Sequence, residues 1–218
     1  MRLSILCGLG PLFFVFSLTG CVSTKISAPA ITERAVKEIV PLKIDYQNLP
    51  GEESIALVNP AGRKSGVTNE PGRLDKVMVP AIEKIVKNKG YAITDDVNKA
   101  RGVLTINFAE FGIYWTAGMS KGSGRIATDV DHYITPKNSG NKLWKWNYKN
   151  DKEYGHLPGN CISGIAGCTI IGIIPWMIYV NNKGGLEGTQ MTREGNALLN
   201  DYFTKLERAL PAAGGVIR

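Results

Sequence analysis

The chain has 218 residues, of which 44% are hydrophobic and 21% are charged. These fractions are ordinary for a globular protein, so they exclude a disordered chain, a collagen-like fibre and a protein with many membrane spans. The 26 lysines and arginines outnumber the 19 aspartates and glutamates, which gives a formal net charge of +7. The length suits one domain, with or without appendages.

The first twenty residues have the organisation of a secretory signal peptide. Arg2 supplies a positive charge, and residues 3–18 form an uncharged apolar run. Small residues then precede Cys21, as at a signal cleavage site. The stretch Leu18-Thr19-Gly20-Cys21 resembles the lipobox of bacterial lipoproteins.

This resemblance implies that residues 1–20 are removed and that Cys21 carries a diacylglycerol and an acyl chain such as palmitate. Two or three acyl chains hold a protein durably at a bilayer surface. Val22, in place of an aspartate, implies the outer membrane, with the body facing the periplasm. An uncleaved membrane anchor is the alternative, which Pro11 and the glycines of this stretch disfavour because they weaken a helix.

Besides Cys21, the predicted lipidation site, the mature chain contains two cysteines, Cys161 and Cys168. In an oxidising compartment, two cysteines this close most simply form a disulfide. A zinc site is the alternative, but His132 and His156 show no ligand spacing with the pair. We therefore predict no metal site.

The first half of the mature chain reads as a tether followed by a strand and a helix. Residues 21–50 are assigned to the tether, with a short helix possible near 31–40. Residues 52–59 read as a strand. Apolar residues at helical spacing predict a helix over 74–89, with Gly90 as its end. Pro80 implies that this helix either kinks or begins near Val79.

The second half reads as strands, a hairpin and a late helix. Strands are predicted at 91–94 and 102–111, the latter continuing through 113–115. Alternating residues predict a hairpin, with 125–134 and 142–149 as its strands and 136–141 as its turn. Its first strand groups Ile126, Thr128, Val130, His132 and Ile134 on one face, and its second strand groups Trp144, Trp146 and Tyr148. A final helix is predicted over 192–210, where apolar residues form a stripe and Pro211 follows.

These elements predict an α+β domain over residues 51–211, with a mostly antiparallel sheet and two helices on one face. A glycine-rich apolar insertion over 155–188 interrupts the domain. The layout resembles that of the small periplasmic α+β domains of envelope lipoproteins.

Residues 162–180 contain no charged side chain. Three interpretations stay open: burial in the core, contact with a membrane as a re-entrant or assembled element, or docking to another protein. Under the last two, the contacting residues are Ile170, Ile171, Ile173, Ile174, Trp176, Met177 and Tyr179. This stretch is similar to the apolar segments of the surface-exclusion and complement-resistance lipoproteins of conjugative plasmids, although it lies later in the chain.

The sequence offers no motif for catalysis. It has no phosphate-binding loop and no nucleophile elbow. Asp131 and His132 alternate along a strand and so point in opposite directions. We predict no catalytic residue and no cofactor. Basic clusters, including Lys142, Lys145 and Lys149, are interpreted as solvated surface or as contacts for anionic lipid headgroups.

Together these features predict a non-enzymatic outer-membrane lipoprotein that acts as an accessory or structural component of the envelope. Its expected partners are the membrane, through the lipid, and an envelope protein or further copies of the chain. Nucleic acid is not expected in this compartment. The alternatives are a surface-exclusion or complement-resistance type of lipoprotein, and an oligomer that inserts into the membrane through residues 162–180.

Overall fold

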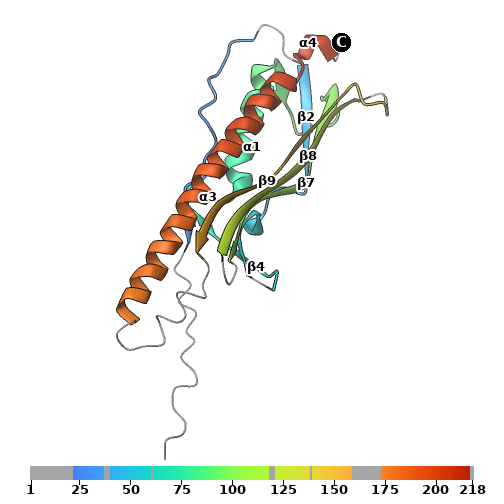
Figure 1. Ribbon diagram of the computed structural model, residues 1–218. Coiled ribbons are helices and arrows are strands. Elements are labelled where there is room, and N and C mark those ends of the chain that lie inside the picture. Colours follow the sequence, from blue (N-terminus) through green and yellow to red (C-terminus); the bar gives the residue numbers. More distant parts are fainter. Residues whose placement is uncertain are drawn as a thin grey trace, which may run out of the picture.

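The computed structural model describes residues 22–36, 40–59, 61–117, 121–137, 139–158 and 173–216. A long curved sheet forms one layer, and helices α1 and α3 form the other (Figure 1). The described elements, in chain order, are β1 (Ser23–Thr24), β2 (Val40–Gln47), a 3₁₀ turn (Glu52–Ser54), β3 (Ile55–Val58), β4 (Lys64–Gly66), β5 (Thr68–Asn69), α1 (Leu74–Asn88), β6 (Tyr91–Ile93), β7 (Gly102–Ala117), β8 (Lys121–Pro136), β9 (Trp144–Pro158), α3 (Ile173–Ala209) and α4 (Ala213–Val216).

Strand β7 is the centre of the main sheet. Its first half pairs with β2 and its second half with β3, both in parallel, while β8 pairs antiparallel along its other side. The sheet is completed by β6, which pairs with β2, by β4, which pairs with β3, and by β9, which pairs with β8. β1 and β5 form a separate parallel pair.

The prediction of a mostly antiparallel sheet is wrong, because the sheet is mixed. Among the described strand pairings, β1–β5, β2–β6, β2–β7 and β3–β7 are parallel, and β3–β4, β7–β8 and β8–β9 are antiparallel. Parallel neighbours require a crossover connection. Helix α1 lies in the connections from β2 and β3 to β7, which places these strands in parallel.

The hairpin predicted from alternating residues is confirmed and is longer than expected. β8 and β9 pair from Ile134 and Trp144 at one end to Lys121 and Pro158 at the other. β8 therefore begins at Lys121, four residues before the predicted strand start at residue 125.

The two predicted helices cover one face of the sheet, as expected (Figure 1). The side chains predicted to share a face of β8 are all buried on this side: Ile126, Thr128, Val130, His132 and Ile134. Ile126, Val130 and Ile134 belong to one hydrophobic core with side chains of both helices. On the opposite face, β8 and β9 carry charged side chains that pair across the strands, such as Arg125 with Asp151.

Helix α1 matches its prediction and runs through Pro80 without ending there. It begins at Leu74, so the alternative start near Val79 is wrong. Its buried side chains are Leu74, Met78, Ala81, Ile82, Ile85 and Val86. Gly90 follows the helix with φ +92°, a conformation that glycine adopts without strain.

Helix α3 begins at Ile173, well before the predicted start at residue 192. Much of the expected insertion over 155–188 is therefore part of this helix. The first residues of the insertion, up to Pro158, belong to β9. Residues 159–172 lie outside the described residues.

Part of the predicted tether lies in the sheet. Residues 40–47 form β2, which pairs with both β6 and β7. The helix expected near 31–40 is absent from the described residues 31–36, which have no regular secondary structure. The folded body thus includes chain that the sequence pattern assigned to a linker.

Candidate functional site

The segment just after Cys21 is fixed to the body of the protein. Residues 22–36, here called the arm, run along α3 in the same direction as the helix (Figure 1). Val22 is 7% exposed and Ile26 is fully buried, so two apolar anchors hold its start. Full burial of such a side chain stabilises a protein by about 1.5–3 kcal/mol.

The side chain of Asn69 forms hydrogen bonds with the backbone of the arm. Its side-chain oxygen accepts from the N–H of Ile26 at 2.8 Å, and its amide nitrogen donates to the Ile26 carbonyl at 3.0 Å. The Thr24 hydroxyl donates to the same oxygen, and the Asn69 nitrogen also donates to the Gly72 carbonyl. One amide thus satisfies both polar groups of a buried backbone unit.

Helix α3 provides the second row of contacts. Thr192 accepts from the N–H of Lys25 at 2.9 Å, and Asn196 accepts from the N–H of Ser27 at 2.8 Å. Where the arm approaches α3 most closely, the helix has Gly188, which lacks a side chain. A Cβ added to Gly188 would lie 2.2 Å from the Ser23 carbonyl oxygen.

The far end of the arm is attached to α1 and α3. Asn88 accepts from the N–H of Arg34 at 3.0 Å and donates to the Thr32 carbonyl at 2.8 Å. The Arg34 guanidinium forms an ion pair with Glu207 at 3.0 Å. Asn69, Asn88 and Asn196, on three different elements, therefore form hydrogen bonds mainly with the backbone of the arm.

The contacts of the arm fix the position of its first residues, Val22 and Ser23, relative to α3. Val22 and Ser23 contact α3 at Gly188, with the residues from Ile173 to Glu187 still preceding on the helix. At 1.5 Å per residue, the helix extends about 22 Å beyond that contact. The start of the arm and the start of α3 thus point to the same end of the molecule.

Several of the predicted site residues lie in parts of the chain that the structure does not describe. Cys21, Cys161, Cys168, Ile170 and Ile171 lie outside the described residues. The remaining predicted contact residues lie in the first turns of α3: Ile173, Ile174, Trp176, Met177 and Tyr179. Within the described residues, no helix combines the length and the apolar character needed to cross a membrane.

His132 lies in the core and forms a hydrogen bond there. Its Nε2 lies 2.8 Å from the Tyr202 hydroxyl of α3. Burial lowers the pKa of the His132 imidazole to about 4, and burial raises the pKa of the Tyr202 phenol well above its usual value. The Trp146 ring packs against His132 with centroids 4.7 Å apart. His132 and Tyr202 are fully buried, and this cluster ties β8 and β9 to α3.

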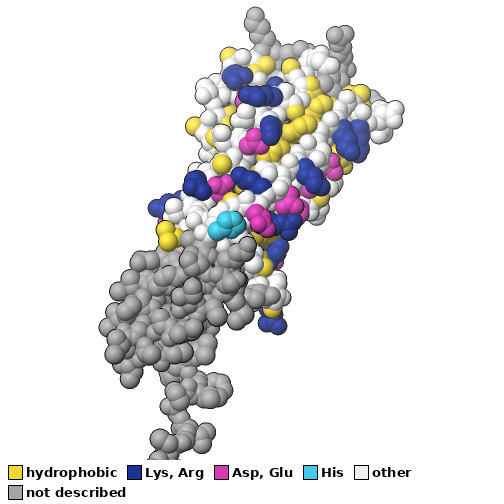
Figure 2. Space-filling model, in the orientation of Figure 1, with side chains coloured by type: hydrophobic (Ala, Val, Ile, Leu, Met, Phe, Trp, Pro, Cys, Tyr) yellow, Lys and Arg dark blue, Asp and Glu magenta, His cyan; other side chains and the backbone are white. Residues whose placement is uncertain are grey.

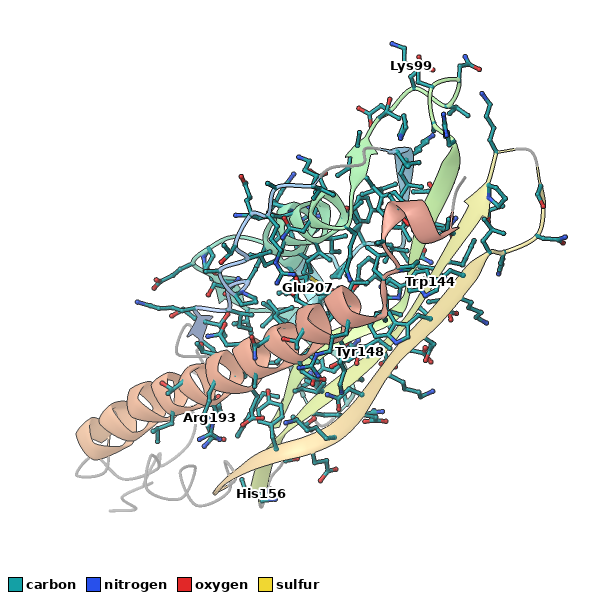
Figure 3. All side chains as sticks on the ribbon, turned by 90° about the horizontal axis from the view of Figure 1, so that it is seen from above. Lys99, Trp144, Tyr148, His156, Arg193 and Glu207 are labelled. Atoms are coloured by element: carbon teal, nitrogen blue, oxygen red, sulfur yellow. The ribbon has the colours of Figure 1, made fainter. Side chains whose placement is uncertain are left out.

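Further side-chain hydrogen bonds connect β9 to α3 along the helix. Tyr148 donates to Asp201 at 2.8 Å, and Lys152 donates to Glu194 at 2.9 Å. The Lys152 ammonium holds the pKa of Glu194 below its usual range. In Figure 3, Trp144 and Tyr148 point from β9 toward the helices.

The polar face of the sheet carries paired charges. Arg125 and Asp151 form a two-pronged ion pair, and Lys149 lies 3.1 Å from Asp129. A hydrogen bond from Asn147 and one from Lys149 lower the pKa of Asp129. Among the described residues, no group of histidine, cysteine, aspartate or glutamate side chains has the arrangement of a metal site.

The asparagine contacts were not predicted from the sequence. Asparagine is common in turns, so a lone Asn69 or Asn88 carries no signal for backbone binding. Two lysines of the predicted basic cluster have separate partners in the structure: Lys142 lies over the Tyr133 ring, and Lys149 pairs with Asp129.

Comparison with known proteins gives a likeness of low score. No protein-family model matches the chain, and a search of curated proteins finds no relative. A DUF330 protein from Xanthomonas campestris is similar in structure at 5% identity and a TM-score of 0.35, over 86% of this chain and 96% of that one.

Two solved lipoproteins are also similar. Lipoprotein GNA1162 from Neisseria meningitidis has 8% identity and a TM-score of 0.31, over 62% of this chain and 99% of its own. A minor lipoprotein from Acinetobacter baumannii has 9% identity and the same TM-score of 0.31, over 79% of this chain and 95% of its own. At these scores the likeness decides nothing about function.

Proposed function

We propose that this chain is a bacterial lipoprotein acylated at Cys21, which acts as a non-enzymatic component of the envelope and holds a folded domain close to the membrane. The lipobox Leu18-Thr19-Gly20-Cys21 supports the acylation. The arm supports the placement: Val22 is buried against α3, so a lipid on the preceding residue would be attached without a flexible linker. In this proposal the arm is a strut that sets the height and orientation of the domain.

The outer membrane, with the domain in the periplasm, is the proposed location, on the basis of Val22 after the cysteine. In an oxidising periplasm, Cys161 and Cys168 would form a disulfide. The expected partners are envelope proteins or further copies of the chain.

Acylation is tested by labelling growing cells with alkyne-tagged palmitate and measuring the mass of the mature N-terminus. We expect label on the wild type and on Cys7→Ser, because Cys7 would leave with the signal peptide, and none on Cys21→Ser. An unlabelled wild type, or a mature protein beginning at Met1, contradicts the proposal. Separation of the two membranes on a density gradient then tests the outer-membrane location, and protease treatment of intact cells tests surface display of the surface-exclusion kind.

A second candidate function is insertion into the membrane as an oligomer through residues 162–180. One observation favours it: α3 is continuous from Ile173 past Gly188, so its uncharged first turns extend beyond the start of the arm. A bilayer reached by a lipid on Cys21 would then meet these turns.

Lipids brominated at known acyl positions test this second function, because bromine quenches tryptophan fluorescence at short range. In a variant that keeps Trp176 as its only tryptophan, deep bromines should quench most strongly if these turns enter the bilayer. Quenching that depends on no bromine position would reject insertion and leave the lipid anchor unaffected.

A further inference from the structure

Strand β9 forms an open edge of the main sheet. It extends over Trp144–Pro158 and pairs with β8 along its length, and within the described residues no strand pairs with its other side. The opposite edge of the sheet is made of the short strands β4 and β6. A long edge strand presents unpaired backbone N–H and C=O groups and is a template for another strand.

Apolar surface lies beside the first half of this edge. Trp144 and Trp146 are only partly buried against the core, and Leu143 is 48% exposed. Figure 2 shows a strip of hydrophobic side chains between the upper part of α3 and β9, with basic side chains on both sides. A strand added to β9 would lay every second side chain over this strip.

The same half of the edge is basic. Lys145 is exposed and forms no ion pair with any of the described residues. Lys149 is 69% exposed although it pairs with Asp129. Lysines on an edge strand oppose pairing with neutral or basic strands. An acidic strand would instead be attracted, so these lysines select the partner rather than close the edge.

A second copy of the chain fits this edge poorly. Antiparallel pairing of two β9 strands would turn the two Cys21 ends in opposite directions, which one bilayer cannot accommodate. Parallel pairing would bring the two basic halves to the same height and place their lysines close together. A different chain with acidic side chains meets neither obstacle.

We propose that residues 143–149 at the edge of β9 bind an extended acidic segment of an envelope partner by strand addition. Backbone pairing supplies the attachment, the lysines select acidic side chains, and Trp144 and Trp146 accept apolar side chains at alternate positions. This inference deepens the proposed function by naming the chemistry of the partner and the surface that binds it.

Binding is tested with the full mature chain in detergent micelles and two labelled octapeptides, one alternating valine with glutamate and one alternating valine with lysine. Fluorescence anisotropy should show saturable binding of the glutamate peptide, at least tenfold tighter than that of the lysine peptide and weakened by salt. The variant K145E/K149E should reverse this order. The variant K76E/K87E reverses two exposed lysines of α1 and should leave it unchanged.

Hydrogen–deuterium exchange separates strand addition from simple charge attraction. The glutamate peptide should slow exchange of the amides in residues 143–149 and leave those of α1 unaffected. Absence of saturable binding, the same preference in K145E/K149E, or unchanged exchange at the edge overturns the proposal. Dimerisation of the chain through β9 in sedimentation experiments also overturns it, in favour of a second copy as occupant. These results are independent of palmitate labelling at Cys21, so failure here and failure of the lipoprotein function are distinguishable.

Discussion

The side chain of Asn69 forms hydrogen bonds with both the N–H and the carbonyl of Ile26, at 2.8 and 3.0 Å, in a buried part of the protein. Asn69→Ala leaves these two groups unpaired in a site where Ile26 is fully buried. Each buried polar group that loses its partner costs about 1–3 kcal/mol, so we expect the free energy of unfolding to fall by about 2–4 kcal/mol. Urea unfolding followed by tryptophan fluorescence measures this loss.

The substitution Asn69→Asp distinguishes hydrogen bonding from size. A carboxylate keeps the shape but cannot donate to the carbonyls of Ile26 and Gly72. It should therefore destabilise the protein about as much as alanine does. Asn98→Ala is the matched control, because the described contact of Asn98 with Lys137 uses only its backbone carbonyl. A loss of stability in Asn98→Ala equal to that in Asn69→Ala would contradict the role of the amide.

Gly188 and Gly185 provide a paired test of the arm on one helix. An added Cβ at Gly188 would lie 2.2 Å from the Ser23 carbonyl oxygen, whereas at Gly185 it would meet nothing within 4 Å. Gly188→Ala should therefore displace the start of the arm, at a cost of about 1–3 kcal/mol. Gly185→Ala should stabilise the helix by up to about 1 kcal/mol.

Thermal unfolding and hydrogen exchange of the arm measure this difference. The amides of Lys25 and Ser27, which donate to α3, should exchange faster in Gly188→Ala and at the wild-type rate in Gly185→Ala. Equal exchange in both variants would mean that the arm does not depend on close approach at Gly188.

Local patterns predicted the hairpin and the helices but not the connections between distant strands. The alternation of β8 and β9 is legible because both strands have one apolar and one polar face. β2 has the same alternation, with Val40, Leu42, Ile44 and Tyr46 toward the helices. Pro41, Lys43 and Asp45 made this segment resemble a linker rather than a strand. Its parallel partner β7 lies some sixty residues later in the chain.

The candidate site was predicted only in part for a related reason. The lipobox is a contiguous motif, so Cys21 can be found from the sequence alone. The arm is held by backbone contacts from Asn69, Asn88 and Asn196, and such contacts leave no periodic or apolar pattern in the arm itself. Gly184 and Gly185 lie in the predicted glycine-rich insertion, before the predicted helix start at residue 192, yet α3 continues through them. Glycine lowers helix stability by only about 1 kcal/mol per residue, and tertiary packing overrides this preference.

The buried His132 predicts a loss of stability in mild acid. Its pKa is about 4 in the folded protein and near 6.5 in an unfolded chain. As the pH falls below about 6.5, the unfolded chain binds a proton that the folded protein does not, so stability decreases until about pH 4. The full effect is on the order of 3 kcal/mol.

Urea unfolding at several pH values tests this expectation. Between pH 7 and 5, His132→Gln should lose less stability than the wild type, because glutamine does not titrate. The wild type and the variant share the acidic groups of the sheet, so the difference between their slopes isolates the histidine. Identical slopes would show that His132 does not change protonation on unfolding in this range.

Pro80 offers a last test of the interior of α1. The helix continues through this position although proline lacks the N–H that would bond to the Lys76 carbonyl. Pro80 is exposed, so Pro80→Ala restores a hydrogen bond without disturbing the core. We expect a gain of about 1–3 kcal/mol, reduced by the greater freedom of the unfolded chain. Pro71→Ala, in a turn, should instead lose about 0.4–1 kcal/mol. If Pro80→Ala destabilises the protein in urea while Pro71→Ala behaves as expected, the proline is required for the geometry of α1 against the sheet.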